Sequence, residues 1–135
     1  MRSNSRLLPF ICFFPLFCLL SCGQSHAGAD TPPTEAEVIK YFTKWKEDSA
    51  MNDPLRPAKK VETTVSDIKF GSKMKKQVGR GEEAREVWAV KANLVTKIFL
   101  KNGTEQTREH RLESNEAWFF FRDGFGEWTA KYGPM

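Results

Sequence analysis

A two-residue alternation over residues 88–100 constrains the fold more than any other feature of the sequence. Successive side chains of a strand point to opposite faces of a sheet, so this pattern predicts one long strand with a buried face. The face consists of Trp88, Val90, Ala92, Leu94, Thr96, Ile98 and Leu100. Asn102-Gly103 follows at once and predicts a hairpin with a two-residue type I′ turn. The chain must therefore contain an antiparallel sheet with long central strands.

Three further segments complete the predicted sheet. Val61, Thr63 and Val65 alternate, and Ile68 continues in the opposite phase, which predicts a bulge near Ser66-Asp67. Residues 71–81 are basic and bounded by glycines, so we expect a loop there. The segment after Gly103 is polar through Arg111 and aromatic at 118–121, and a last strand follows a turn at 123–126. About four strands result.

The pairing of the central hairpin is open at this stage. Strict pairing about Asn102-Gly103 places Leu94 opposite Arg111 and Val90 opposite Asn115. Either a bulge shifts the returning strand, or the middle of that strand lies over a partly solvated face.

A helix is predicted before the sheet. Thr34 and Glu37 have the spacing of a capping box, and Val38, Phe42 and Trp45 recur at helical spacing. We expect this stripe to pack on the sheet, which needs a cover, rather than to serve a partner. The residues expected on the solvated face are Lys40, Lys44, Lys46 and Glu47.

Together these elements predict a single α+β domain over residues 34–135, with one N-terminal helix packed on a curved antiparallel sheet of about four strands. The arrangement, with its closing segment Glu127-Trp128-Thr129-Ala130-Lys131, resembles the cystatin-like and NTF2-like class over residues 34–132. The resemblance implies a cleft between the helix and the curved sheet. It carries no diagnostic catalytic motif.

The N-terminal segment is typical of a secretory signal peptide. Arg2 and Arg6 precede the apolar residues 7–20, which are too few for a comfortable membrane span and contain Pro9 and Pro15. We therefore expect a signal peptide over residues 1–21 rather than a retained anchor helix.

The exit from that segment, Leu19-Leu20-Ser21-Cys22, resembles the lipobox of bacterial lipoproteins. The resemblance implies cleavage between Ser21 and Cys22 and a diacylglycerol group on the Cys22 thiol. Residues 22–33 are small, polar and rich in Gly and Pro, which predicts a flexible tether. The domain would then face the periplasm or the cell exterior from the cell membrane or the outer membrane, and Gly23 after the cysteine favours the outer membrane.

Cysteine usage and charge exclude several classes of function. The three cysteines are Cys12, Cys18 and Cys22, so residues 23–135 can form neither a disulfide nor a cysteine metal site. The chain has 21 basic and 17 acidic residues; loss of Arg2 and Arg6 lowers the net charge from +4 to +2. A nearly neutral domain gives no reason to expect nucleic acid as a partner.

Catalytic signals are weak. His110 is the one histidine of residues 34–135, and the sequence contains no HExxH, GxSxG, P-loop or dinucleotide motif. The acid/base pair that could be considered is His110 with Asp67. We therefore expect no catalytic residues, no metal and no cofactor.

The most unusual feature is an aromatic group near the C-terminus. Consecutive strand residues cannot share a face, so we expect one alternating pair of residues 118–121 to be core and the other to be less buried. The less buried residues form a candidate partner or ligand surface, drawn from Trp118, Phe119, Phe120, Phe121, Phe125 and Trp128.

Three functions are compatible with these patterns. The first is a non-catalytic envelope lipoprotein that binds a protein partner or helps an assembly. The second is a small-molecule carrier or sensor that uses the cleft between helix and sheet. The third is an isomerase or dehydratase built on His110 and Asp67.

Overall fold

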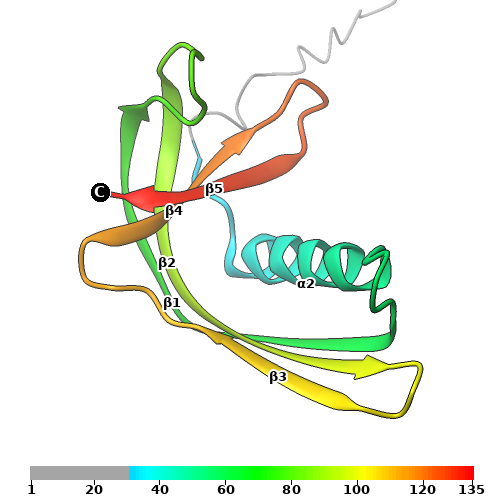
Figure 1. Ribbon diagram of the computed structural model, residues 1–135. Helices are drawn as coiled ribbons and strands as arrows, with labels where there is room; N and C mark the ends of the chain where they lie inside the picture. The colour runs from blue at the N-terminus through cyan, green and yellow to red at the C-terminus, as the bar shows by residue number, and fades with distance from the viewer. Residues whose placement is uncertain (1–30) are drawn as a thin grey trace, which may run out of the picture.

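The computed structural model describes residues 31–135. The predicted signal peptide, the lipobox and the tether up to residue 30 lie outside the described residues. The described chain forms one helix followed by five strands (Figure 1). These are α2 (Glu35–Met51), β1 (Ala58–Lys76), β2 (Arg85–Leu100), β3 (Glu105–His110), β4 (Glu116–Arg122) and β5 (Trp128–Pro134). The predicted α+β class is confirmed.

All strands belong to one antiparallel sheet in the order β1-β2-β4-β5, and β3 also pairs with β2. Strand β2 pairs with β1 on one side and with β3 and then β4 on the other. The long β1–β2 hairpin bends strongly, and α2 lies within the curve (Figure 1). The fold has five strands rather than about four because the polar and aromatic halves of the returning segment are separate strands.

The register of the central hairpin follows the first of the two alternatives, a shift in the returning strand. The backbone N–H of Leu100 donates to the Thr104 carbonyl, which leaves a three-residue loop with Gly103 at φ +85°. The predicted two-residue turn is therefore wrong. Leu94 lies opposite His110, whereas Val90 lies opposite Trp118 because the residues between β3 and β4 leave the ladder.

Strand β1 contains the predicted bulge. Its pairing with β2 shifts between Ser66 and Lys69, and Asp67 has φ +54°, a backbone conformation that Asp tolerates better than most residues. The predicted basic loop over 71–81 is wrong in its first half. Strand β1 continues to Lys76, and the connection to β2 spans residues 77–84.

The helix begins as predicted, but its buried stripe differs. Thr34 and Glu37 form the capping box, and Val38 and Phe42 are fully buried. Trp45 is 37% exposed. The stripe follows a strict four-residue spacing, Val38, Phe42, Lys46 and Ala50, so Lys46 takes the inward position that the sequence suggested for its neighbour.

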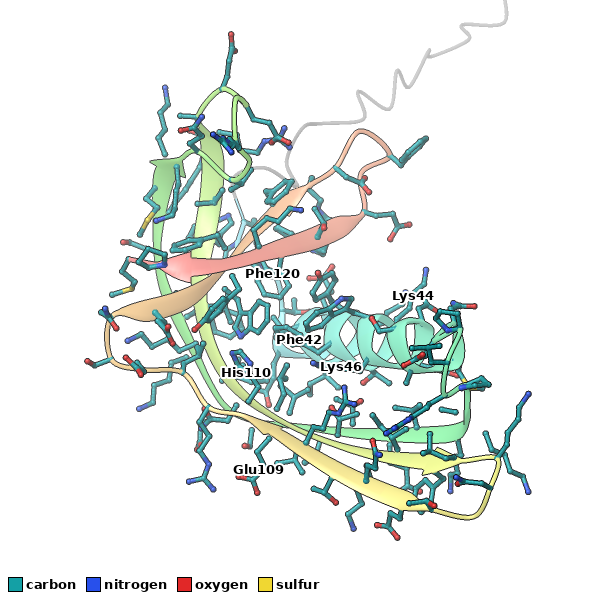
Figure 2. All side chains as sticks on the ribbon, viewed as in Figure 1. Phe42, Lys44, Lys46, Glu109, His110 and Phe120 are labelled. Carbon is teal, nitrogen blue, oxygen red and sulfur yellow. The ribbon has the colours of Figure 1, made fainter. Side chains whose placement is uncertain are left out.

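The main core lies between α2 and the sheet. Phe42 packs edge-on against Trp118 and Phe120, with ring centroids 5.0 and 5.7 Å apart. Figure 2 shows Phe42 and Phe120 facing each other across this layer. The remaining buried members of the cluster are Val38, Val90, Ala92, Leu94 and Ala130.

A second core lies on the opposite face of the sheet. Phe119 and Phe121 pack with Val87, Ala89 and Ala117, and partly buried Met74 and Val78 cover them. The Lys76 ammonium lies 4.2 Å from the centre of the Phe119 ring and donates to the Pro134 carbonyl, so it closes this face from β1 to β5. The Arg85 guanidinium covers Phe121 in the same way, at 4.6 Å.

The expectation of one exposed aromatic pair on β4 is therefore wrong. Trp118 and Phe120 are buried under α2, and Phe119 and Phe121 are buried in the second core. Both faces of β4 are covered because the curled sheet brings Met74 of β1 and Val78 of the 77–84 connection over the face that has no helix.

Candidate functional site

The six aromatic residues proposed as a surface separate into two groups. The four of β4 are buried, as described above, whereas Phe125 is 93% exposed and Trp128 is partly buried. The surface that remains lies at the β4–β5 turn, residues 123–127, and on Trp128.

An open groove runs between α2 and this turn. Its volume is about 750 Å³, and we call it the α2–hairpin groove. The helix contributes Tyr41, Lys44 and Trp45 to its lining, and Tyr41 also donates from its hydroxyl to the Ala130 carbonyl at 3.2 Å. The lining carries acidic, basic and aromatic side chains close together. These are Glu37, Asp48, Asp123, Glu127, Lys40, Lys44, Arg122, Tyr41, Trp45 and Trp128.

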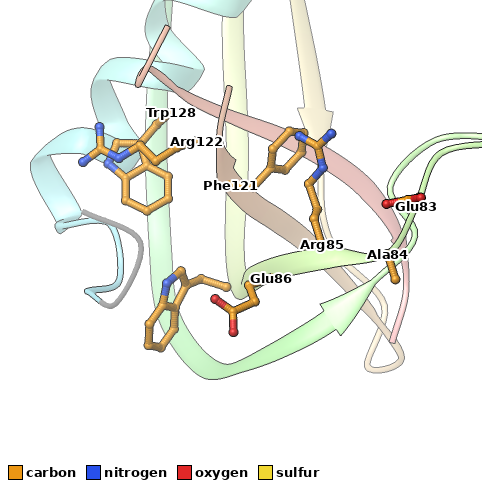
Figure 3. A pocket seen from close by; sticks show the side chains of 8 residues that line it. Glu83, Ala84, Arg85, Glu86, Phe121, Arg122 and Trp128 are labelled. Carbon is orange, nitrogen blue, oxygen red and sulfur yellow. The ribbon is translucent and has the colours of Figure 1, made fainter. Parts of the chain in front are cut away.

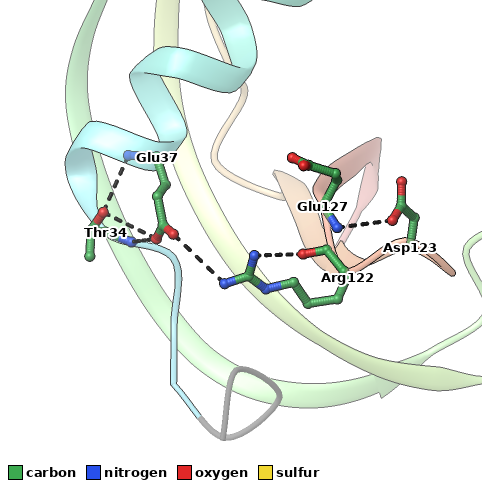
Figure 4. A network of polar contacts seen from close by, with 6 residues as sticks. Thr34, Glu37, Arg122, Asp123 and Glu127 are labelled. Carbon is green, nitrogen blue, oxygen red and sulfur yellow. Dashed lines mark hydrogen bonds and ion pairs between the residues drawn. The ribbon is translucent and has the colours of Figure 1, made fainter. Parts of the chain in front are cut away.

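The turn that forms one wall is held by short polar contacts (Figure 4). The Asp123 carboxylate accepts from the backbone N–H of Phe125 at 2.8 Å and of Glu127 at 2.9 Å. The Arg122 guanidinium donates to the Gly126 carbonyl at 2.8 Å and lies 4.1 Å from the centre of the Trp128 ring. The wall is therefore held in shape by contacts within the turn itself.

Arg122 also ties this turn to the start of the helix. Its Nη2 lies 3.7 Å from Glu37 Oε1, at half-exposed side chains, so the pair contributes modestly to stability. The pKa of Glu37 is lowered, chiefly by the backbone N–H of Thr34, with smaller contributions from the Thr34 hydroxyl and Arg122. Glu37 is thus charged at neutral pH, and the ends of both walls are fixed relative to each other.

A second hollow of about 350 Å³ lies beside the groove, between residues 83–86 and the end of β4 (Figure 3). Figure 3 shows the Arg122 side chain against the Trp128 ring and Arg85 against Phe121. Arg122 and Trp128 line both hollows, so they form the ridge between them.

His110 and Asp67 do not form an acid/base pair. His110 lies opposite Leu94, on the face that α2 covers. The centre of its ring lies 5.3 Å from the ring centre of Trp118 and 5.1 Å from that of Tyr132. Figure 2 shows His110 on the helix side of β3 and Glu109 on the other side. Asp67 accepts from the side-chain amide of Asn93, which neighbours Leu94 on β2 and points to the opposite face.

Within residues 31–135, no three His, Cys, Asp or Glu side chains come close enough together to hold a metal ion. The described part of the chain also contains no helix with the length and apolar character of a membrane span.

Tyr41, Lys44 and Trp45 line one wall of the groove together, and the sequence pattern did not predict them as a functional group. The available signal was the four-residue spacing of Val38 and Phe42, which turns this helix flank away from the sheet centre.

Comparison of the chain with protein-family models, with curated proteins and with solved structures found no match.

Proposed function

We propose that this chain is a lipid-anchored protein of the bacterial cell envelope whose domain binds another envelope protein in the α2–hairpin groove. The anchor is inferred from Leu19-Leu20-Ser21-Cys22, placed directly after a basic and apolar segment. The binding function is inferred from one observation, the mixed lining of an open and preorganised groove.

That lining suits a polypeptide. Carboxylates such as Glu37 and Glu127 stand beside cations such as Lys44 and Arg122 along the same groove. A polypeptide segment carries both charge signs and apolar side chains, so it can complement such a surface along its length. Trp45 and Trp128 supply aromatic anchors of the kind that contribute most to protein–protein affinity.

The two other functions find less support. The space between α2 and the sheet around Phe42 is filled by the rings of Phe42, Trp118 and Phe120, and the cavity near Ala50 has a volume of only about 110 Å³. An isomerase or dehydratase would need His110 and Asp67 in one cleft, and they lie on opposite faces of the sheet. A non-catalytic binding module requires neither an interior cavity nor an acid/base pair.

The proposal is tested by photo-crosslinking in intact cells, with a photoreactive residue at Lys44 in the groove. We expect a discrete adduct of one envelope protein. The same probe at Lys97, which is exposed on the opposite face of β2, is the matched control and should give no such adduct.

The adduct must also depend on the chemistry of the groove. Glu127→Lys reverses a charge beside the probe and should reduce the yield, whereas Glu62→Lys on β1 should leave it unchanged. Equal adducts from Lys44 and Lys97, or a yield insensitive to Glu127→Lys, would contradict the assignment of the groove.

A further inference from the structure

Lys46 lies in line with the buried stripe of α2 and is itself partly buried. It stands four residues after Phe42 and four before Ala50, both buried, and Figure 2 shows it on the side of the helix that faces β2 and β3. Burial lowers the pKa of Lys46, and the nearby Arg108 lowers it further. A partly buried cation beside a second, exposed cation is an arrangement that an anion would relieve.

The sheet under Lys46 carries a row of polar residues. Thr96 on β2 pairs with Thr63 on β1 and with Arg108 on β3, so the three side chains cross the sheet on the helix-covered face. Thr96 is 3% exposed, and its hydroxyl finds no hydrogen-bond partner among residues 31–135. The Thr63 hydroxyl is also buried and also finds no hydrogen-bond partner among these residues. Buried hydroxyls are nearly always hydrogen-bonded, so these two indicate a missing partner.

A cavity of about 110 Å³ lies between the helix and this row. Lys46, Arg108 and Thr96 line it on the polar side, and Ala50, Ile98 and Leu100 line it on the apolar side. A water molecule accounts for roughly 30 Å³ of liquid, so the cavity has room for about four waters or one small organic ion.

The charge of the lining is positive. Lys46, Arg56 and Arg108 face a single carboxylate, Asp53. Asp53 Oδ1 already accepts from the backbone N–H groups of Leu55 and Arg56, at 2.8 and 3.1 Å. Asp53, whose pKa is lowered chiefly by these two N–H groups and further by Arg108 and Arg56, offsets one of these three positive charges, so the lining keeps a net positive charge.

We propose that this cavity binds the carboxylate of a small organic acid. The Thr96 hydroxyl donates to one carboxylate oxygen, Lys46 and Arg108 neutralise the charge, and the alkyl part of the acid lies against Ala50, Ile98 and Leu100. This binding can be tested apart from the proposed partner interaction, because the cavity and the α2–hairpin groove share no lining residue.

The test is a titration of the full-length protein in detergent with sodium butyrate, with sodium chloride at equal ionic strength as reference. The Lys46 ammonium lies 4.1 Å from the centre of the Trp45 ring, so tryptophan fluorescence reports on the cavity. We expect saturable quenching or enhancement with butyrate and none with chloride. Arg108→Gln should weaken binding about tenfold or more, as the loss of a charge-assisted hydrogen bond does.

Two further variants separate binding from folding. Thr96→Val keeps the shape and removes the unpaired hydroxyl, so it should weaken butyrate binding while leaving the melting temperature without ligand unchanged or higher. Arg111→Gln removes an exposed cation, paired with Glu109, that does not line the cavity, and should leave binding unchanged.

Sodium phosphate, which has no alkyl part, should bind more weakly than butyrate. The proposal is overturned if butyrate gives no saturable signal, if Arg108→Gln and Arg111→Gln bind equally well, or if phosphate binds as tightly as butyrate.

Discussion

Tyr132 and Glu116 form the most strongly perturbed titrating pair among the described residues. Tyr132 lies opposite Trp118, two residues along β4 from Glu116, so the two side chains share one face of the sheet. Chiefly through a hydrogen bond to Glu116, the pKa of Tyr132 is raised to about 12. The same hydrogen bond lowers the pKa of Glu116.

This pair predicts a pH dependence at the alkaline end. The unfolded phenol loses its proton near pH 10, whereas folded Tyr132 keeps it until about pH 12. The contribution of Tyr132 to stability is therefore complete below pH 10 and lost as pH rises through about 12. In an ultraviolet titration of tyrosinate, Glu116→Gln should move Tyr132 back toward its ordinary value.

The control is a carboxylate with a smaller effect on the pKa of Tyr132. Glu113 contributes the smallest of the causes that raise the pKa of Tyr132, so Glu113→Gln should shift the titration less than Glu116→Gln. If both tyrosines of the wild-type domain titrate together near pH 10, the hydrogen bond between Tyr132 and Glu116 is absent.

At the scale of the element, the burial of strand β4 on both faces assigns its aromatic residues to the core. Phe120 is buried under α2, whereas Phe119 is buried on the other face beneath Lys76. A strand buried on both faces by one helix and by its own sheet is unusual for an antiparallel fold, where one face is often solvated. Because both faces of β4 are buried, all four of its aromatic residues belong to the core.

An alanine series on β4 should therefore be uniformly destabilising. Replacement of Trp118, Phe119, Phe120 or Phe121 by Ala should each lower the free energy of unfolding by about 3–5 kcal/mol, the usual cost for a buried aromatic. Denaturant melts provide the measurement. Phe125→Ala, at the exposed turn, is the control and should change stability by less than about 0.5 kcal/mol.

The two variants on the face without a helix test this most directly. A loss below roughly 1 kcal/mol for Phe119→Ala or Phe121→Ala would mean that the second core is open in solution. That outcome would restore this face as a candidate partner surface.

At the scale of the whole molecule, the packed part of the domain begins at a residue that precedes the helix in the chain. Pro33, the last residue of the predicted tether, is buried, and Val38 five residues later is buried as well. These are the positions of a hydrophobic staple, which sets the angle at which the chain enters the helix. Packing therefore reaches one residue into the predicted tether.

The proposed anchor predicts how the chain is processed. Cys22→Ser should abolish metabolic labelling with radioactive palmitate and leave unprocessed precursor, because the proposed site of lipid attachment is the Cys22 thiol. Cys18→Ser, within the same apolar segment, should leave both labelling and processing unchanged. Labelling that persists in Cys22→Ser would remove the basis for a lipid anchor.

Features that depend on neighbours along the chain could be predicted from the sequence. The period of residues 88–100, the capping box of Thr34 and Glu37 and the bulge at Asp67 are each set by a few adjacent residues, and each is confirmed. Their causes are local: alternation of side chains in a strand, satisfaction of free helix donors, and a backbone conformation that Asp tolerates.

Features that depend on how the sheet curls could not be predicted. The apolar pattern predicted Trp45 in the packed stripe and Lys46 on the solvated face. Trp45 packs edge-on against Trp118 but stays 37% exposed, and Lys46 is partly buried, because the angle of α2 across the sheet decides how far each turns inward. The shift from Leu94–His110 to Val90–Trp118 pairing depends on a loop that leaves the ladder. Burial of Phe119 and the row of Thr96, Arg108 and Lys46 bring together segments far apart in sequence, and only tertiary packing decides such contacts, because no local preference encodes them.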